Sequence, residues 1–131
     1  MTTVGSPVLE LAPDPESVRA ARRYVTDRLT CWGLEPLVDT AALLVSEVVT
    51  NAVLHARSAV RLAVTRSRDD AVTIAVSDLS RRLPRQRRYA EDASTGRGMR
   101  LLNQLAEDWQ VTVTSTGKTV SFTVMAAAAA G

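Results

Sequence analysis

The sequence has very little of the two residue types that most often bind transition metals. Cys31 is the only cysteine and His55 the only histidine among 131 residues. A lone cysteine excludes a disulfide within the chain, and it also excludes a zinc site built from several cysteines. Metal binding through soft ligands is therefore not expected. This cysteine usage is typical of reducing compartments, so we expect a cytoplasmic protein.

Aromatic residues and long apolar runs are also scarce. Aromatics make up 4% of the chain although 46% of it is hydrophobic, so Ala, Val and Leu must supply most of the core. We see no apolar run long enough to span a membrane, and residues 1–9 lack a signal-peptide pattern. A net charge of +2 predicts no general affinity for nucleic acid. The length fits one domain over residues 1–131, with a core over about 8–125 and an alanine-rich tail over 126–131.

The most informative stretch is residues 43–56, with the sequence LLVSEVVTNAVLHA. Its apolar residues recur every three to four positions without Gly or Pro, which predicts a helix. We expect this helix to begin at Pro36, before the stretch itself. The predicted apolar surface holds Ala41, Leu44, Val45, Val48, Val49 and Ala52. Glu47, Asn51 and His55 follow one another at intervals of four residues, so Glu47 and Asn51 share a face and His55 lies at its edge.

A carboxylate one helical turn before an amide suits two tasks on one ligand. The Glu47 carboxylate could accept a proton from a hydroxyl group or water, and the Asn51 amide oxygen could coordinate a hard cation such as Mg²⁺. The plainer alternative is an amphipathic helix whose polar stripe faces water. The apolar character of the stretch favours a cavity, as does the modest helix propensity of Asn and His. His55 is equally compatible with a hydrogen bond at the helix end.

The rest of the chain alternates between strand and helix patterns. We predict a strand over 8–11, a helix from the N-cap Asp14 to about Thr30, strands over 59–66 and 71–77, a helix over 99–108, and strands over 109–115 and 119–125. Strands joined by short polar turns predict antiparallel hairpins. This order predicts an α+β fold, a two-layer sandwich of a mostly antiparallel mixed sheet with helices on one face.

The end of the predicted strand 71–77 is a second candidate site. Asp78 follows this strand, with Ser80 and Pro84 after it. A carboxylate that points into a pocket there can accept a hydrogen bond from an exocyclic amine such as that of adenine. Thr119, on the last strand, could line the floor of that pocket. The plainer alternatives are an Asp that merely ends a strand and a Thr that merely suits a pleated sheet.

A third candidate site precedes the predicted helix over 99–108. Gly96 and Gly98 would let the backbone approach a phosphate closely, and the N-terminus of the helix at Met99 favours an anion. Arg97 could add a charge-assisted hydrogen bond. The alternative is a flexible turn.

Residues 78–98 show no convincing periodicity, and loops of that length in compact domains are usually functional or disordered. The segment holds a cluster of arginines, Arg81, Arg82, Arg85, Arg87 and Arg88. These could steer phosphates, face a protein partner or bind nucleic acid. Nucleic acid ranks last because one tyrosine is the only aromatic residue nearby that could stack on bases.

In their order along the chain, these motifs resemble the GHKL ATPase superfamily, which contains gyrase, histidine kinases, a chaperone family and mismatch-repair ATPases. The resemblance runs from Val8 to Met125 and rests on the phrases SEVVTNAVLHA, GRGMRLLNQLAEDW and GKTVSF. The chain looks most like the small anti-sigma factor serine/threonine kinases and related stand-alone ATP-binding proteins of actinobacteria. That resemblance implies a Bergerat-type fold, ATP and Mg²⁺ as cofactors, and a sigma factor or an anti-sigma antagonist as partner. It implies no direct contact with nucleic acid or membrane, and relatives of this kind often form homodimers.

The resemblance also implies roles for single residues. Glu47 matches the base that activates the attacking hydroxyl group, and Asn51 matches the ligand of the nucleotide-bound Mg²⁺. Asp78 matches the carboxylate that recognises the adenine amino group, and Thr119 matches a threonine that supports it. The glycines of residues 96–98 match a glycine box at a lid hinge, whose backbone meets the phosphates.

We therefore expect an ATP-dependent protein kinase that transfers the γ-phosphate to a Ser of an antagonist partner. The alternative is a non-catalytic module that sequesters a sigma factor, with nucleotide as a switch or absent. One departure favours this alternative: the usual first glycine box, Asp-x-Gly-x-Gly, is replaced by residues 78–82, DLSRR, with neither glycine. The pairing of Glu47 with Asn51 favours the kinase, because a pure binding module needs no base beside a metal ligand.

Overall fold

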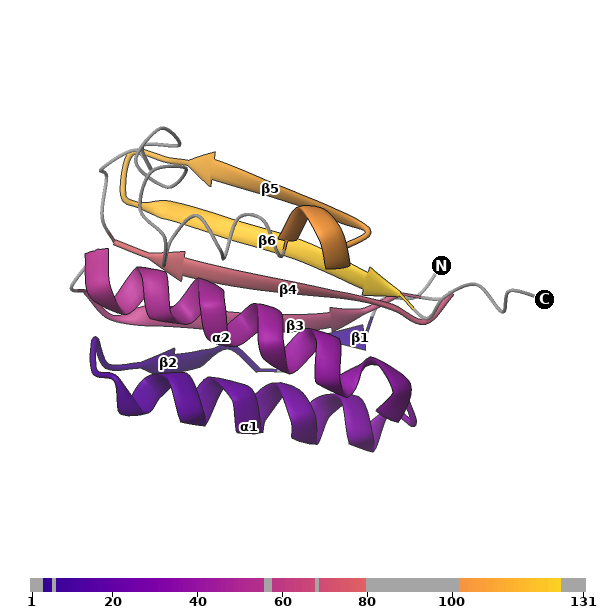
Figure 1. Ribbon diagram of the computed structural model, residues 1–131. Helices are drawn as coiled ribbons and strands as arrows, with labels where there is room; N and C mark the ends of the chain where they lie inside the picture. Colours follow the sequence, from indigo (N-terminus) through magenta and orange to yellow (C-terminus); the bar gives the residue numbers. More distant parts are fainter. Residues whose placement is uncertain (1–3, 6, 56–57, 68, 80–101, 126–131) are drawn as a thin grey trace.

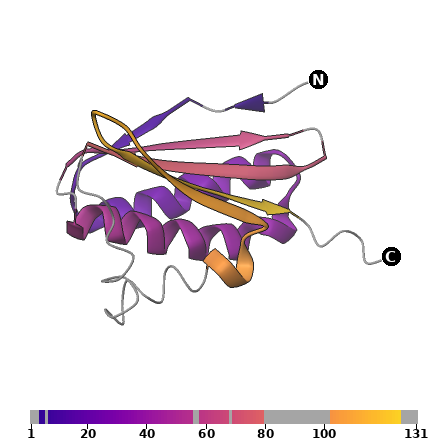
Figure 2. The same cartoon turned by 90° about the horizontal axis from the view of Figure 1, so that it is seen from above.

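The protein is a two-layer α+β sandwich with one open sheet face. The computed structural model describes residues 4–5, 7–55, 58–67, 69–79 and 102–125. Two long helices lie side by side against one face of a single sheet, and no described helix covers the other face (Figure 1 and Figure 2). Residues 102–105 form a short helical turn on the same side as the long helices (Figure 2). The α+β fold with helices on one face is thus confirmed.

The first long helix, α1 (Glu16–Cys31), begins and ends about one residue later than the sequence predicts, with Pro15 as its N-cap. At its start, the Glu16 backbone N–H donates to Asp14 Oδ1 at 2.9 Å, the capping contact expected from an Asp at this place. Gly33, just beyond its end, has φ of 74°, a left-handed conformation that glycine adopts without steric cost. A short 3₁₀ helix, η1 (Glu35–Leu37), leads into α2 (Val38–His55).

Among the described residues the sheet has six strands: β1 (Val4–Gly5), β2 (Leu9–Leu11), β3 (Val60–Arg66), β4 (Ala71–Asp78), β5 (Asp108–Val113) and β6 (Lys118–Met125). The strand order is β1-β3-β4-β6-β5, and β2 also pairs with β3. We expected a mostly antiparallel sheet with some parallel pairing. Every strand pair in the described part of the chain is antiparallel. The two-residue strand β1 was not predicted, because two residues carry no periodicity.

The core lies between the helices and the inner face of the sheet. All six residues predicted for the apolar surface of α2 are buried, and Ala21, Val25 and Leu29 of α1 are fully buried. The strands contribute alternate residues, as half-buried strands must. The alternating set includes Val60, Leu62 and Val64, then Val72, Ile74 and Val76, and finally Phe122 and Val124. This packing fixes which face of α2 lies against the sheet.

The predicted helix over 99–108 extends too far. Helical structure is described for residues 102–105, residues 99–101 lie outside the described part, and Asp108 already belongs to β5. The Glu107 backbone N–H donates to the Thr123 carbonyl at 2.7 Å, so pairing with β6 begins here. The ladder hydrogen bonds of the sheet thus override the local helix preference of this segment.

The segment Glu35–Leu54 is long and apolar enough to cross a membrane, contrary to our expectation that no such run exists. Half of it is buried inside the protein, against α1 and the sheet. The central helix of a packed core meets the same criterion because it must be apolar on most sides.

Adjacent leucines on α2 provide a test of this packing. Leu44 is fully buried, whereas Leu43 is 42% exposed. We expect Leu44→Ala to lower the free energy of unfolding by about 2–5 kcal/mol, because it leaves a cavity in the core. Leu43→Ala should cost less than about 1 kcal/mol. Urea unfolding measures both, and equal losses would contradict the orientation of α2.

Candidate functional site

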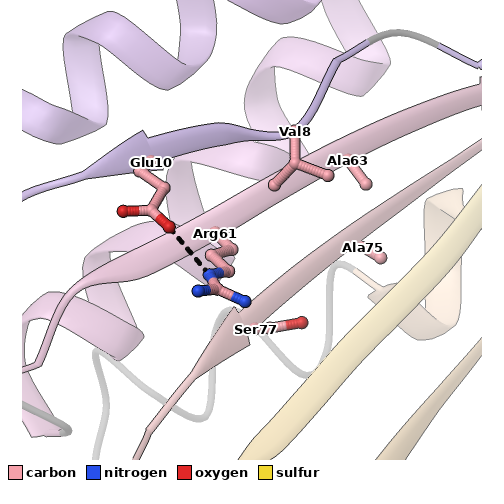
Figure 3. Close-up of a pocket in the computed structure, with 6 residues that line it drawn as sticks. All are labelled: Val8, Glu10, Arg61, Ala63, Ala75 and Ser77. Atoms are coloured by element: carbon pink, nitrogen blue, oxygen red, sulfur yellow. Dashed lines mark hydrogen bonds and ion pairs between the residues drawn. The ribbon is translucent and has the colours of Figure 1, made fainter.

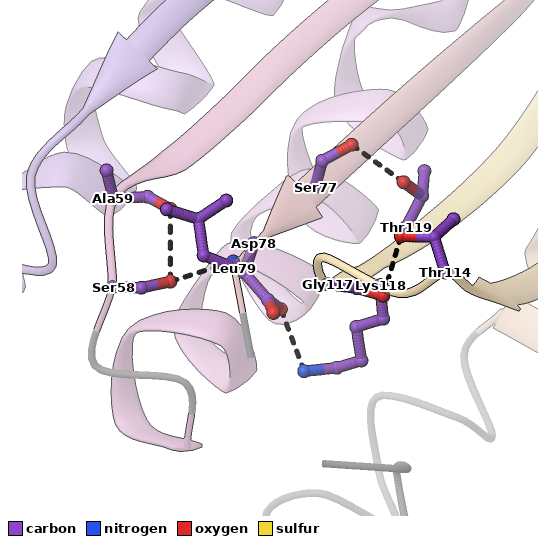
Figure 4. A network of polar contacts seen from close by, with 9 residues as sticks. All are labelled: Ser58, Ala59, Ser77, Asp78, Leu79, Thr114, Gly117, Lys118 and Thr119. Carbon is purple, nitrogen blue, oxygen red and sulfur yellow. Dashed lines mark hydrogen bonds and ion pairs between the residues drawn. The ribbon is translucent and has the colours of Figure 1, made fainter. Parts of the chain in front are cut away.

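A buried ion pair joins the end of β4 to the start of β6. Lys118 Nζ donates to Asp78 Oδ2 at 2.8 Å, and the side chains are 6% and 3% exposed, respectively (Figure 4). The two residues are directly opposite each other in the β4–β6 register. Removing either charge from water costs several kcal/mol, so each side chain depends on the other as its partner.

The backbone around Asp78 is fixed from two sides. A Cβ atom on Gly117 would lie 2.0 Å from the Asp78 carbonyl oxygen, so only glycine lets the β5–β6 turn come this close. The Leu79 backbone N–H donates to Ser58 Oγ at 3.0 Å, just beyond the Asp78 carboxylate along the chain (Figure 4). The carboxylate is therefore held at a defined place at the strand end, as a recognition group must be.

Thr119 lines one pocket with Asp78, but its hydroxyl group does not contact the Asp78 carboxylate. Thr119 Oγ1 and Ser77 Oγ form a hydrogen bond of 2.8 Å, and these two residues are also directly opposite in the register (Figure 4). Successive residues of a strand point to opposite faces, so Thr119 lies on the open face when Lys118 lies inside. The residue that contacts Asp78 from the last strand is Lys118.

The polar residues of α2 lie at the border of its apolar surface. Glu47 and Asn51 are both half-buried, between the buried Val48 and Ala52 and the solvent. The C-terminal part of α2 and the end of β4 lie at the same end of the molecule (Figure 1). The fold thus brings a carboxylate–amide pair on α2 and a carboxylate–ammonium pair on the sheet to one end of the protein. His55 is the last residue of α2.

This arrangement agrees with the comparisons to known proteins. The family model described as histidine kinase-like ATPase domain matches residues 11–124. The chain belongs to this family. Its fold also matches the histidine kinase domain of the blue-light activated histidine kinase from Erythrobacter litoralis, with a TM-score of 0.54 and 26% sequence identity. The match covers 66% of this chain and 43% of that one. No curated protein matches the chain significantly.

Membership of the histidine kinase-like ATPase family implies that the protein binds ATP, typically with Mg²⁺. Among the described residues, no three His, Cys, Asp or Glu side chains gather into a metal site. Such an ion would rely on nucleotide phosphates and water for most of its ligands, as Mg²⁺ commonly does. Asn51, the predicted protein ligand of this ion, is half-buried.

Several predicted site residues of this ATPase domain lie outside the described part of the chain. They are Ser80, Pro84, Gly96, Arg97, Gly98 and Met99, together with the arginine cluster of residues 81–88. Their roles in nucleotide binding stay predictions.

The open face of the sheet holds a shallow pocket of a different character. Arg61 Nε donates to Glu10 Oε2 at 3.0 Å there, and both side chains are 62% exposed (Figure 3). The other lining residues are small or apolar: Val8, Ala63, Ala75 and Ser77. An exposed ion pair contributes at most about 1 kcal/mol, and none of these residues belongs to the predicted ATP site.

Sequence reasoning missed Lys118, although a signal was present. In the last strand Val120, Phe122 and Val124 are apolar and alternate with Thr119, Ser121 and Thr123. Lys118 is in phase with the apolar set, which places it on the inner face. Lysine is rarely buried unless it is paired, so the alternation was not extended to it.

The buried Asp78–Lys118 pair and the exposed Glu10–Arg61 pair allow a matched test. Lys118→Met should lower the free energy of unfolding by about 3–5 kcal/mol, because it leaves the Asp78 charge buried without its counter-ion. The double variant Asp78→Asn/Lys118→Met should recover most of that loss. Arg61→Met, which breaks the exposed pair, should cost less than about 1 kcal/mol. Denaturant titrations of the wild type and the three variants measure these free energies of unfolding. A double variant no more stable than Lys118→Met would contradict the pairing.

Proposed function

We propose that the protein is an ATP-dependent serine/threonine kinase of the anti-sigma factor type. Its substrate would be a Ser of a small antagonist protein, and its further partner would be a sigma factor. The observation that carries the proposal is the buried Asp78 at the end of β4, a strand that packs against the helix carrying Glu47 and Asn51, within a histidine kinase-like ATPase domain. A cytoplasmic location and a homodimer belong to the same proposal.

Each polar group has a task in this scheme. The Asp78 carboxylate accepts a hydrogen bond from the adenine amino group, and the Asn51 amide oxygen binds the Mg²⁺ that accompanies the phosphates. Glu47 precedes Asn51 by one helical turn, so it lies within reach of the same reacting groups. The glycines at 96 and 98 would contact the phosphates.

The transfer itself needs little covalent chemistry from the protein. The Ser oxygen of the partner attacks the γ-phosphorus, the bond to the ADP oxygen breaks, and Glu47 orients the hydroxyl group or takes up its proton. Positioning and charge neutralisation dominate catalysis of this reaction. A half-buried carboxylate suits the role of Glu47, because partial exclusion of water strengthens its interaction with the hydroxyl group.

The alternative is a non-catalytic module that sequesters its protein partner. One observation favours it: the Asp78 carboxylate already binds Lys118, and a nucleotide has to be accommodated beside that contact. In this alternative, ATP binds weakly or acts only as a switch. The two functions predict different results in a binding measurement and a transfer measurement.

The binding measurement is calorimetric titration with ATP and Mg²⁺. We expect saturable binding to the wild-type protein and an affinity at least about tenfold lower for Asp78→Asn, since a charge-assisted hydrogen bond is lost. Thr73→Val is the control: its hydroxyl group pairs with Thr123, away from the end of β4 that carries Asp78, so its affinity should equal that of the wild type. Absence of ATP binding by the folded wild-type protein would reject the kinase and leave the sequestering module.

The transfer measurement uses γ-labelled ATP, Mg²⁺ and an extract of the source cells, in which phosphoserine on a small protein is detected. Glu47→Ala should abolish transfer while changing ATP affinity by less than about threefold, because the base acts after binding. Glu35→Ala, an exposed glutamate on η1, should transfer at the wild-type rate. Equal transfer by Glu47→Ala and wild type would remove Glu47 from the reaction.

A further inference from the structure

We propose that Lys118 is a specificity-determining residue of the nucleobase pocket. It donates a hydrogen bond directly to the ring nitrogen N1 of adenine while Asp78 accepts one from the neighbouring amino group. This inference rests on the proposed ATP site, and it adds a protein group that the motif comparison did not assign. The observation behind it is the buried contact of 2.8 Å between Lys118 Nζ and Asp78 Oδ2.

The chemistry of the pair matches the edge of the base. Adenine presents a donor, its amino group, directly beside an acceptor, N1. The Asp78 carboxylate is an acceptor and the Lys118 ammonium next to it is a donor with three N–H groups. One N–H binds Asp78, so further ones are available for a ligand, and an ionised carboxylate can accept several hydrogen bonds at once.

The surrounding structure keeps the two groups in this order. Asp78 and Lys118 are directly opposite in the β4–β6 register, and the close approach of Gly117 to the Asp78 carbonyl fixes the strand ends against each other. A base cannot displace the lysine cheaply, because that would separate two buried opposite charges. The ammonium group therefore stays in place, and the base has to bind to the intact pair.

The pair should also discriminate against other purines. Hypoxanthine and guanine carry an oxygen where adenine has its amino group and an N–H at N1. In the same pose they would face the carboxylate with an acceptor and the ammonium with a donor, a mismatch at both positions. Sites that hydrogen-bond a ligand group discriminate strongly against analogues that lack it, because their own buried groups are left unpaired.

The experiment compares ADP with 1-deaza-ADP, which has C–H in place of N1 and keeps the amino group. For the wild-type protein, we expect 1-deaza-ADP to bind at least about tenfold more weakly than ADP, because one buried hydrogen bond is lost. In Lys118→Met this difference should shrink to less than about threefold. The analogue 7-deaza-ADP, altered on the far edge of the base, should show the same ratio to ADP in both proteins.

Lys118→Gln serves as a second variant, because its amide can still donate to Asp78 and support the fold while being too short to reach N1 as well. It should also lose the preference for ADP over 1-deaza-ADP.

If the preference is as large in the folded variants as in the wild type, Lys118 only supports Asp78 and the proposal is overturned. It is also overturned if the wild type binds both ligands equally, or if a variant binds ADP more tightly, since the lysine would then block the base. A wild type that binds no ADP at all rejects the ATP site itself, which is a separate and distinguishable failure.

Discussion

The contact between Asp78 and Lys118 constrains both the fold and the site. Two opposite charges lie almost completely inside the protein, with side chains 3% and 6% exposed. A shift of the β4–β6 register by one residue would turn one of them to the open face and leave the other buried alone. The pair therefore specifies one register of the central strands, and that register also aligns Val76 and Phe122 with the core.

The same elements supply stability and the polar groups of the site. Helix α2 packs because residues such as Leu44 and Val48 recur at helical spacing, and Glu47 and Asn51 lie at the edge of that surface. Their half-burial is a consequence of where the apolar stripe ends. The candidate site needs no separate framework: it forms where the C-terminal half of a core helix meets the end of a core strand.

The spacing of apolar residues in the sequence predicted the features of the fold that depend on core packing. The buried face of α2 and the alternation of β3 and β4 follow from apolar spacing alone, so they could be read from the sequence. The end of the third helix could not, because Glu107 takes part in a ladder with Thr123 that local preference does not reveal. Thr119 lines one pocket with Asp78, and the alternation of its strand also accounts for the bond of its hydroxyl group to Ser77. The partner of Asp78 then had to be found from the register, in which Lys118 is directly opposite.

The free energies of the ion pair and of a hydrogen bond to adenine decide how a nucleotide can bind beside Asp78 and Lys118. Separating a buried ion pair costs about 3–5 kcal/mol when one partner is lost. A hydrogen bond from an adenine edge returns about 0.5–1.5 kcal/mol, or up to about 3 kcal/mol where a charged group takes part. One such bond from the amino group does not offset the loss of the lysine contact. A base that binds here is therefore stabilised only if it adds its hydrogen bonds to the existing one, which makes the ammonium group of Lys118 part of the surface that the base meets.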